Sequence, residues 1–285
     1  MRNIGRFVLA AAFLSMAMPE RGEAGAWTQK RYYYYVRVTA NAFESEQFFD
    51  KDSQRMPYGD GGRFRDVSLY AYWEYGISPL VTFVGSIPYK TLEYRSPTLE
   101  RQTNGAGDLY FGIRYLLSDR GAVSSLQGAL RVNTGYETDL SILDQAPPLG
   151  DGQTDFELNL LIGNSIFNYV VYYNLEAGYR VRSGAPVDEV PFTLEAGVNL
   201  GKLALIIGKL IGVRAIAEAQ STAPGVGSQI SLSPVEDYLK VNFEFIWNAS
   251  PSVEVAAIAE RVLDGRNTAA GATFGVALSL RGRAR

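Results

Sequence analysis

The stretch GAGDLYFGIRYLL, residues 105–117, alternates two kinds of side chain. Apolar and aromatic residues occupy every second position, namely Leu109, Phe111, Ile113, Tyr115 and Leu117. The positions between them hold Asp108, Tyr110, Gly112 and Arg114. Because successive side chains of a strand point to opposite faces, this stretch predicts a β-strand with one apolar and one polar face. An apolar face turned inward would indicate a soluble sandwich, whereas a polar face turned inward would indicate a barrel surrounded by lipid.

The same alternation recurs along the whole chain. In LKVNFEFIW, residues 239–247, Phe243, Phe245 and Trp247 alternate with Asn242 and Glu244. Twelve strands are expected, at about 29–40, 63–75, 79–94, 106–117, 122–135, 154–165, 168–182, 190–200, 202–218, 235–248, 252–263 and 270–281. Each is about as long as a tilted strand that crosses a bilayer. Only the stretch 202–218 is apolar on both faces, so its register stays open.

The connections between these strands alternate in length. Tight turns are expected at 76–79, 118–121, 164–168, 201–202 and 248–252. Longer loops are expected at 41–62, 95–105, 136–153, 183–190 and 218–234, and a shorter polar one near 264–269. Short turns at one end and long loops at the other are typical of outer-membrane barrels. The pattern therefore predicts an all-β fold: a closed antiparallel transmembrane β-barrel, an up-and-down meander of about 12 strands.

In such a barrel the apolar faces contact lipid, and the polar faces line the interior. Closure pairs every backbone group from strand to strand, as hydrocarbon requires. Glycines on the inner face leave room for larger neighbours. The aromatic residues near strand ends are expected in the girdles at the membrane surfaces, and these are Trp27, Tyr75, Phe167 and Trp247.

The first 26 residues have the pattern of a secretory signal peptide. A basic start, MRNIGR, precedes a short apolar core at 7–18, and the small residues AGA at 24–26 suit cleavage before Trp27. No cysteine follows the core, which excludes a lipoprotein anchor. We therefore expect a cleaved signal at 1–26, a single barrel domain at 27–285, and a location in the bacterial outer membrane.

The composition argues against several classes of function. The 285 residues carry a net charge of −3, with no cysteine and no histidine. This charge gives no reason to expect nucleic acid as a partner. Without an imidazole the chain lacks the usual proton carrier of barrel enzymes, so we expect no enzyme. An acid–base pair of Glu244 with Glu195 or Glu254 is the alternative to plain ion pairing inside the barrel.

No metal or other cofactor is expected. The stretch DKDSQRMPYGDGG, residues 50–62, is similar to a calcium loop, but Arg55 stands where that loop needs a glycine. The inner faces instead predict a wall of mixed charge. The side chains expected to line the lumen are Asp108, Arg114, Tyr172, Asn174, Glu176, Arg180, Arg182, Glu195, Lys240 and Glu244. Further charges expected on the inner faces are Arg37, Asp66, Glu74, Arg131, Glu157 and Glu254.

The glycine-rich GAGDL that leads into GIRY resembles outer-membrane barrels of the meta-pathway phenol-degradation family. The stretches GAWTQ at 25–29 and EYGISPLVTFVGSIPY at 74–89 resemble its XagA-like members. The resemblance implies a small barrel for uptake or release of small apolar compounds. It also implies outer-membrane lipid, lipopolysaccharide and the barrel-assembly machinery as partners. Members of the family usually finish on an aromatic residue, whereas this chain finishes on LSLRGRAR.

Two functions remain open from the sequence. The first is a narrow channel or transporter for a small solute, which suits about twelve strands because eight fill their interior and sixteen leave a wide pore. The second is a closed barrel whose outer loops bind polysaccharide, lipopolysaccharide or a protein. Phe43, Phe48 and Phe49, in the long first loop, favour the second function.

Overall fold

The structure, a computed structural model, describes residues 25–136, 147–150, 152–167, 169–183, 187–216 and 237–284. Except for Gly25 and Ala26, the predicted signal peptide lies outside these residues. Twelve long strands form the body of the described part: β1 (Tyr33–Ser45), β4 (Arg63–Ser78), β5 (Val81–Arg95), β7 (Leu109–Ser118), β8 (Val123–Val132), β9 (Thr154–Ile166), β10 (Val171–Arg182), β11 (Glu189–Leu200), β12 (Ala204–Ala215), β13 (Asp237–Ser250), β14 (Val253–Arg266) and β16 (Ala272–Arg283). No helix among the described residues is long and apolar enough to cross a membrane.

Each long strand pairs antiparallel with its neighbours in the sequence, and the first strand pairs with the last. Residues of β1 lie opposite β4 on one side and β16 on the other, with Val36 between Trp73 and Leu280. The sheet therefore closes on itself without an edge. The predicted closed meander of about 12 strands is confirmed. The first strand begins at Tyr33 rather than near residue 29, because the chain before it turns into the barrel.

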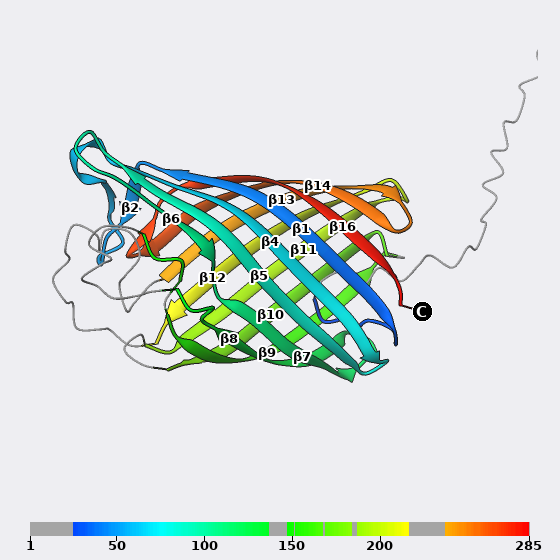
Figure 1. Ribbon diagram of the computed structural model, residues 1–285. Coiled ribbons are helices and arrows are strands. Elements are labelled where there is room, and N and C mark those ends of the chain that lie inside the picture. Colours follow the sequence, from blue (N-terminus) through cyan, green and yellow to red (C-terminus); the bar gives the residue numbers. More distant parts are fainter. Residues whose placement is uncertain are drawn as a thin grey trace, which may run out of the picture.

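The two ends of the barrel differ in their connections. The tight turns near residues 79, 120, 167, 202 and 251 lie at one end, together with the C-terminal strand (Figure 1). We name this end the turn end. The described parts of the longer connections lie at the opposite end, which we name the loop end. Short turns face the periplasm in outer-membrane barrels, so the turn end corresponds to the periplasmic side.

The barrel carries apolar side chains on its outer wall and polar ones inside. Phe243, Phe274 and Val276 on the outer wall are 57%, 69% and 60% exposed. In contrast, Glu74 and Arg114 on the inner wall are 1% and 3% exposed. This inversion of the usual globular pattern is the one that a bilayer requires. The chain is thus a barrel of the outer-membrane type, and the polar face of the stretch 105–117 points inward.

Strand β12 takes the register that the sequence left open. Leu205, Ile207 and Val213 point inward and are buried, whereas Ile206 points outward and is 45% exposed. Lys209 shares the inward face and pairs with carboxylates inside the barrel. The charge of Lys209 decides this register, since an outward lysine here would lie in hydrocarbon.

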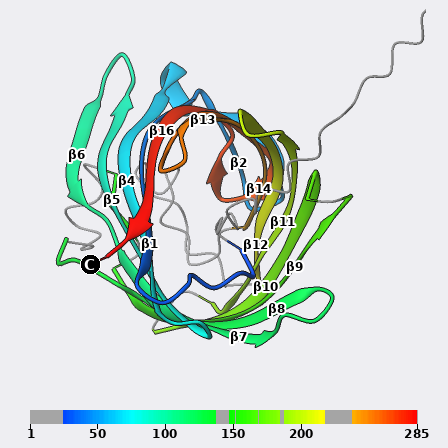
Figure 2. The same cartoon turned by 90° about the vertical axis from the view of Figure 1, so that its right-hand side faces the viewer.

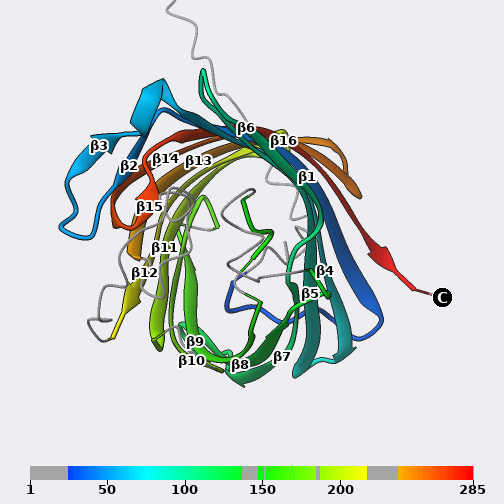
Figure 3. The same ribbon diagram turned by 60° about the vertical axis from the view of Figure 1, so that its left-hand side comes forward.

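Among the described residues, four short strands lie at the loop end. β6 (Glu100–Ala106) pairs with the outer part of β5 and extends the rim as a hairpin. The strands β2 (Gln47–Phe49), β3 (Arg55–Pro57) and β15 (Thr268–Ala269) form a separate small sheet. Figure 3 shows this sheet at the rim of the barrel, beside β14. The first loop is thereby tied to the last one.

Candidate functional site

A short stretch before β1, residues 25–29, lies inside the barrel at the turn end; we name it the lumenal segment. The dark blue chain crosses the opening in Figure 2, which views the barrel from this end. The backbone N–H of Gln29 donates to Oγ1 of Thr82 at 2.7 Å, and its side-chain amide donates to Glu74 at 2.7 Å. The backbone N–H of Ala26 donates to Oδ1 of Asn174 at 3.3 Å. The lumenal segment is therefore bound to opposite walls.

Arg114 links the lumenal segment to the inner wall. Its guanidinium donates to the carbonyl of Trp27 at 3.1 Å, to Glu74 at 2.9 Å and to Gln127 at 3.0 Å. Tyr72 donates to the same carboxylate at 2.5 Å. A buried arginine–carboxylate pair is favourable only when its remaining donors and acceptors are satisfied, as these are.

Trp27 lies inside the lumen, so its predicted place in the outer aromatic girdle is wrong. Its ring meets Tyr172 edge to face, with centroids 6.3 Å apart. Glycines make room for both rings: a β-carbon at Gly163 would strike Trp27, and one at Gly197 would strike Tyr172. The prediction that inner-face glycines accommodate large neighbours is confirmed here. Trp247 and Phe167 do lie on the outer surface, 48% and 74% exposed.

Next to the lumenal segment, a lysine bridges two carboxylates. The ammonium of Lys209 lies 3.1 Å from Glu195 and 3.1 Å from Glu244. Arg37 pairs with Glu244 at 2.6 Å, and Asn174 donates to Glu195 at 3.2 Å. We name these five residues the charged belt, which runs across β1, β13, β12, β11 and β10. The belt joins the lumenal segment through Asn174.

A second network rises from the middle of the barrel towards the loop end. Arg180 pairs with Glu157 at 2.7 Å and with Glu189 at 2.5 Å. Arg182 pairs with Glu189 at 2.7 Å and with Asp155 at 3.6 Å. The two predicted arginines therefore act as counter-charges for three carboxylates.

The remaining predicted site residues lie as follows. Glu176 accepts a hydrogen bond from Asn159 at 2.8 Å, beside the second network. Lys240 lies 3.7 Å from Glu260 and above the ring of Tyr238. Asp108 accepts a hydrogen bond from the hydroxyl of Tyr136. The structure thus brings Tyr172, Asn174, Glu195 and Glu244 together near the turn end, and leaves Asp108 and Lys240 apart from them.

One side of the lumen is apolar. Inward-facing side chains of β10, β12, β13, β14 and β16 form a buried cluster, consisting of Tyr172, Leu205, Ile207, Ile246, Ala256, Ile258 and Ala277. Trp27 of the lumenal segment packs against this cluster. The lumen therefore has an apolar wall beside its charged ones.

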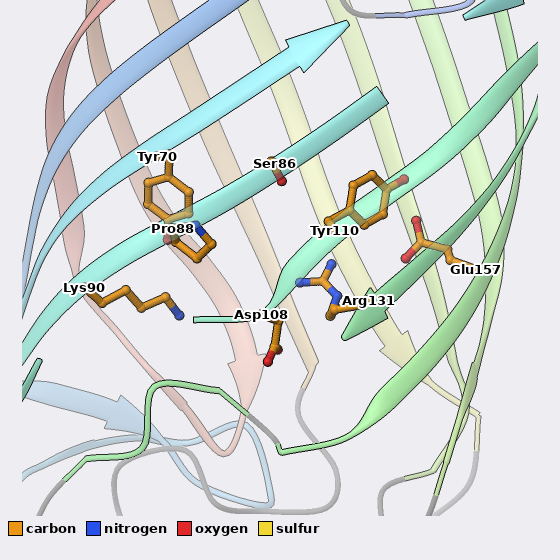
Figure 4. A pocket seen from close by; sticks show the side chains of 8 residues that line it. All are labelled: Tyr70, Ser86, Pro88, Lys90, Asp108, Tyr110, Arg131 and Glu157. Carbon is orange, nitrogen blue, oxygen red and sulfur yellow. The ribbon is translucent and has the colours of Figure 1, made fainter. Parts of the chain in front are cut away.

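Two cavities lie between the charged belt and the loop end. The larger measures about 690 Å³ and borders Arg37, Lys209, Lys240 and Glu244. The smaller measures about 300 Å³, and its walls are Tyr70, Ser86, Pro88, Lys90, Asp108, Tyr110, Arg131 and Glu157 (Figure 4). The two cavities share Tyr70, Lys90, Asp108 and Arg131. The outer part of the lumen can therefore hold water or a small molecule.

A loop narrows this outer part. Leu149 is buried, and its carbonyl accepts a hydrogen bond from Lys90 at 3.0 Å. Residues 147–150 line the larger cavity. The lumen is thus restricted at both ends, by residues 147–150 near the loop end and by the lumenal segment at the turn end.

Sequence reasoning missed Lys209 and Lys90. Lys209 lies in the stretch with two apolar faces, where its own charge was the available signal. Lys90 follows Pro88 on the inward positions of β5, and its place in the alternation would have indicated it. The lumenal segment forms no strand and so has no alternating pattern to indicate its place. Its contacts lie up to 148 residues away in the sequence.

Comparison with known proteins supports the fold. The sequence matches no family model and no curated protein. The COG4313 outer membrane channel from Pseudomonas putida F1 is similar in structure, with a TM-score of 0.70 and 10% sequence identity over 92% of this chain and 100% of that one. A NanC porin is similar with a TM-score of 0.52 and 6% identity, over 86% of this chain and 98% of that one. The fold is that of bacterial outer-membrane barrels.

Proposed function

We propose that this protein is a narrow, gated passage for small solutes in the bacterial outer membrane. The observation that carries the proposal is the inner wall: charged and polar side chains surround cavities of about 690 and 300 Å³ between two restrictions. In a barrel without a passage, side chains fill the interior, and little space of this size remains. The outer-membrane barrels similar to this chain include one described as a channel and one described as a porin, which supports the proposal.

The class of solute follows from the two sides of the lumen. Ion pairs cancel most inner charges, and the cluster around Ile207 and Ile246 adds an apolar wall. The resemblance of GAGDLYFGIRY to the phenol-degradation family, and of GAWTQ to its XagA-like members, supports small apolar or aromatic solutes. We propose membership of that family on these residues, together with a cleaved signal peptide at 1–26.

A catalytic role is not part of the proposal. Glu195 and Glu244, the pair that the sequence offers for acid–base chemistry, share the ammonium of Lys209. A carboxylate bound in this way neutralises a cation. The partners proposed are lipid and lipopolysaccharide around the outer wall and the assembly machinery during insertion.

The second candidate is a closed barrel that binds a polysaccharide, lipopolysaccharide or a protein through its loops. One observation favours it: Tyr58 stacks on Phe48 at 5.3 Å and meets Tyr94 at 5.8 Å, so the first loop is built as an ordered aromatic cluster. Tyr58 is 2% exposed, and burial raises its pKa. Such a cluster gives the loops a fixed surface.

Electrical recording from the purified full-length protein in a planar bilayer separates the two candidates. A passage predicts small, discrete current steps in symmetric salt, and larger steps when the lumenal segment is loosened by Trp27→Ala. Absence of current from both proteins, each shown to be folded by its heat-dependent migration in SDS, would favour the closed barrel.

A further inference from the structure

The smaller cavity differs in charge from the rest of the lumen. The inward cations Arg37, Arg114, Arg180 and Lys209 each have a carboxylate partner within 3.1 Å. Arg131 and Lys90, on the wall of the smaller cavity, have none within ion-pair distance among the described residues. Two cations therefore border one space without an ion-pair partner among the described residues.

The donors of these two cations are only partly used. The guanidinium of Arg131 lies 5.8 Å from the ring centroid of Tyr110, and its buried Nε has no hydrogen-bond partner. Lys90 donates to the carbonyl of Leu149, and an ammonium has two further hydrogens to donate. Figure 4 shows the charged ends of both side chains turned towards the space between them. This arrangement can receive an anion.

The acidic residues of the cavity are engaged elsewhere. Glu157 lies 2.7 Å from Arg180 and accepts a hydrogen bond from Asn159 at 2.7 Å. Asp108 accepts the hydroxyl hydrogen of Tyr136 and keeps its charge, whereas Arg180 neutralises Glu157. Neither carboxylate lies within ion-pair distance of Lys90 or Arg131, so the wall of the cavity has one positive charge in excess of Asp108 for an anionic ligand.

The other walls of the cavity are flat and partly apolar. The rings of Tyr70, Tyr110 and Pro88 surround the space beside the two cations. A cavity of about 150 Å³ holds a benzene molecule, so 300 Å³ is enough for one ring with a substituent. A guanidinium matches a carboxylate with two parallel hydrogen bonds, and aromatic rings prefer offset or edge contacts with one another.

We propose that this cavity binds a small carboxylate that carries a single planar ring, held by Arg131 and Lys90 at its carboxyl group and by Tyr70 and Tyr110 at its ring. The proposal rests on the proposed passage, for which it names the class of solute. It adds a charged group to the apolar or aromatic solutes considered above. The site lies on the side of the charged belt that faces the loop end, so the solute would bind after entering from outside.

Fluorine NMR with 4-fluorobenzoate as the probe tests the site on the purified, folded, full-length protein. The matched probes are 4-fluorobenzyl alcohol, which has the ring without the charge, and fluoroacetate, which has the charge without the ring. We expect the wild type to bind 4-fluorobenzoate at least about tenfold more tightly than either, given the usual strength of charged hydrogen bonds. Equal affinity for the acid and the alcohol would overturn the proposal.

Variants locate the binding. Arg131→Gln and Lys90→Gln should each weaken 4-fluorobenzoate binding about tenfold and leave the alcohol unchanged. Arg261→Gln is the matched control, because Arg261 is exposed on the outer wall near the same end of the barrel. Heat-dependent migration in SDS verifies that each variant is folded. Unchanged affinity in both variants would place the binding elsewhere and overturn the proposal.

Conductance recorded on the same preparations separates this proposal from the proposed function. Current without selective 4-fluorobenzoate binding would overturn the site and leave the passage intact. Selective binding that depends on Arg131 and Lys90, without current, would support the site and overturn the passage.

Discussion

The indole of Trp27 meets the ring of Tyr172 edge to face inside the barrel, with the ring planes 78° apart. This contact fastens the lumenal segment to strand β10. Edge-to-face pairs contribute about 0.5–1.5 kcal/mol beyond their burial, and Trp27 adds the burial of a large ring against the apolar cluster. Trp27 therefore supplies the apolar part of the attachment, beside the hydrogen bonds of Gln29 and Ala26.

Trp27→Ala should loosen the lumenal segment and raise the single-channel conductance in a planar bilayer. The hydrogen bonds of Gln29 to Thr82 and Glu74 remain, so the segment should move between two positions and the current should become noisier. Trp247→Ala is the control. It removes the same indole ring, but from the outer surface of the barrel, where Trp247 is exposed. Equal conductance of wild type and Trp27→Ala would mean that the segment does not restrict the passage.

Lys209→Met should destabilise the barrel. Without the ammonium, Glu195 keeps only Asn174 as a partner. Glu244 keeps Arg37, but one of its two carboxylate oxygens loses its ion pair. Breaking a buried ion pair by removing one partner costs about 3–5 kcal/mol. Unfolding in urea, followed by tryptophan fluorescence, measures this loss.

The double variant Lys209→Met with Glu195→Gln should recover part of the stability, because it also removes one unpaired charge. Lys202→Met, in the exposed turn before β12, is the matched control and should be close to wild type. If Lys209→Met unfolds like the control, the ammonium does not stabilise the charged belt.

The wall of the barrel could be predicted from the sequence because alternation is a local signal. The period of two assigns Phe243 to the outside and Glu244 to the inside without knowledge of any partner. Even in β12, the charge of Lys209 indicates which face points inward. The outer loops are different, since the pairing of β2 with β15 joins residues more than 200 positions apart.

The contents of the lumen were harder to predict, because they depend on contacts across the barrel. The partner of Arg37 is Glu244, 207 residues away, and Trp27 belongs to no strand at all. The sequence around an aromatic residue just before the first strand looks the same whether the ring lies at the membrane surface or inside the barrel. The alternating pattern shows which side chains of a strand point into the lumen. It does not show which side chains of other strands they pair with.

Phe243→Arg should impair folding far more than an arginine placed on the inner wall. Phe243 is 57% exposed on the outer surface, so the variant puts a cation into hydrocarbon at a cost of about 2–4 kcal/mol near the midplane. The inner counterpart is Thr273→Arg, because Thr273 faces the larger cavity and lies opposite the carboxylate of Glu260 on the neighbouring strand. Folded yield in liposomes, read from heat-dependent migration, compares the two variants.

Glu244→Arg is not the mild counterpart that the sequence alone indicates. Glu244 lies 2.6 Å from Arg37 and 3.1 Å from Lys209, so an arginine there would bring three cations together. Equal folded yields for Phe243→Arg and Thr273→Arg would contradict the assignment of the two faces.

From the sequence alone, changing both Arg180 and Arg182 to glutamine should leave folding intact, because no charge moves into lipid. The structure gives a different expectation: Glu157, Glu189 and Asp155 would lose their counter-charges together. We expect the double variant to lose at least about 3 kcal/mol of unfolding free energy, the lower bound for breaking one buried pair.

Adding Glu189→Gln tests whether the loss comes from stranded charge. Glu189 pairs with both arginines, so its neutralisation should restore part of the stability of the double variant. The reversal potential across a salt gradient should shift towards cations in the double variant and return towards the wild-type value in the triple one, because fixed charge sets the preference of a confined path. A double variant as stable as the wild type, with an unchanged reversal potential, would mean that these carboxylates take up protons when the arginines are absent and that the path does not pass them.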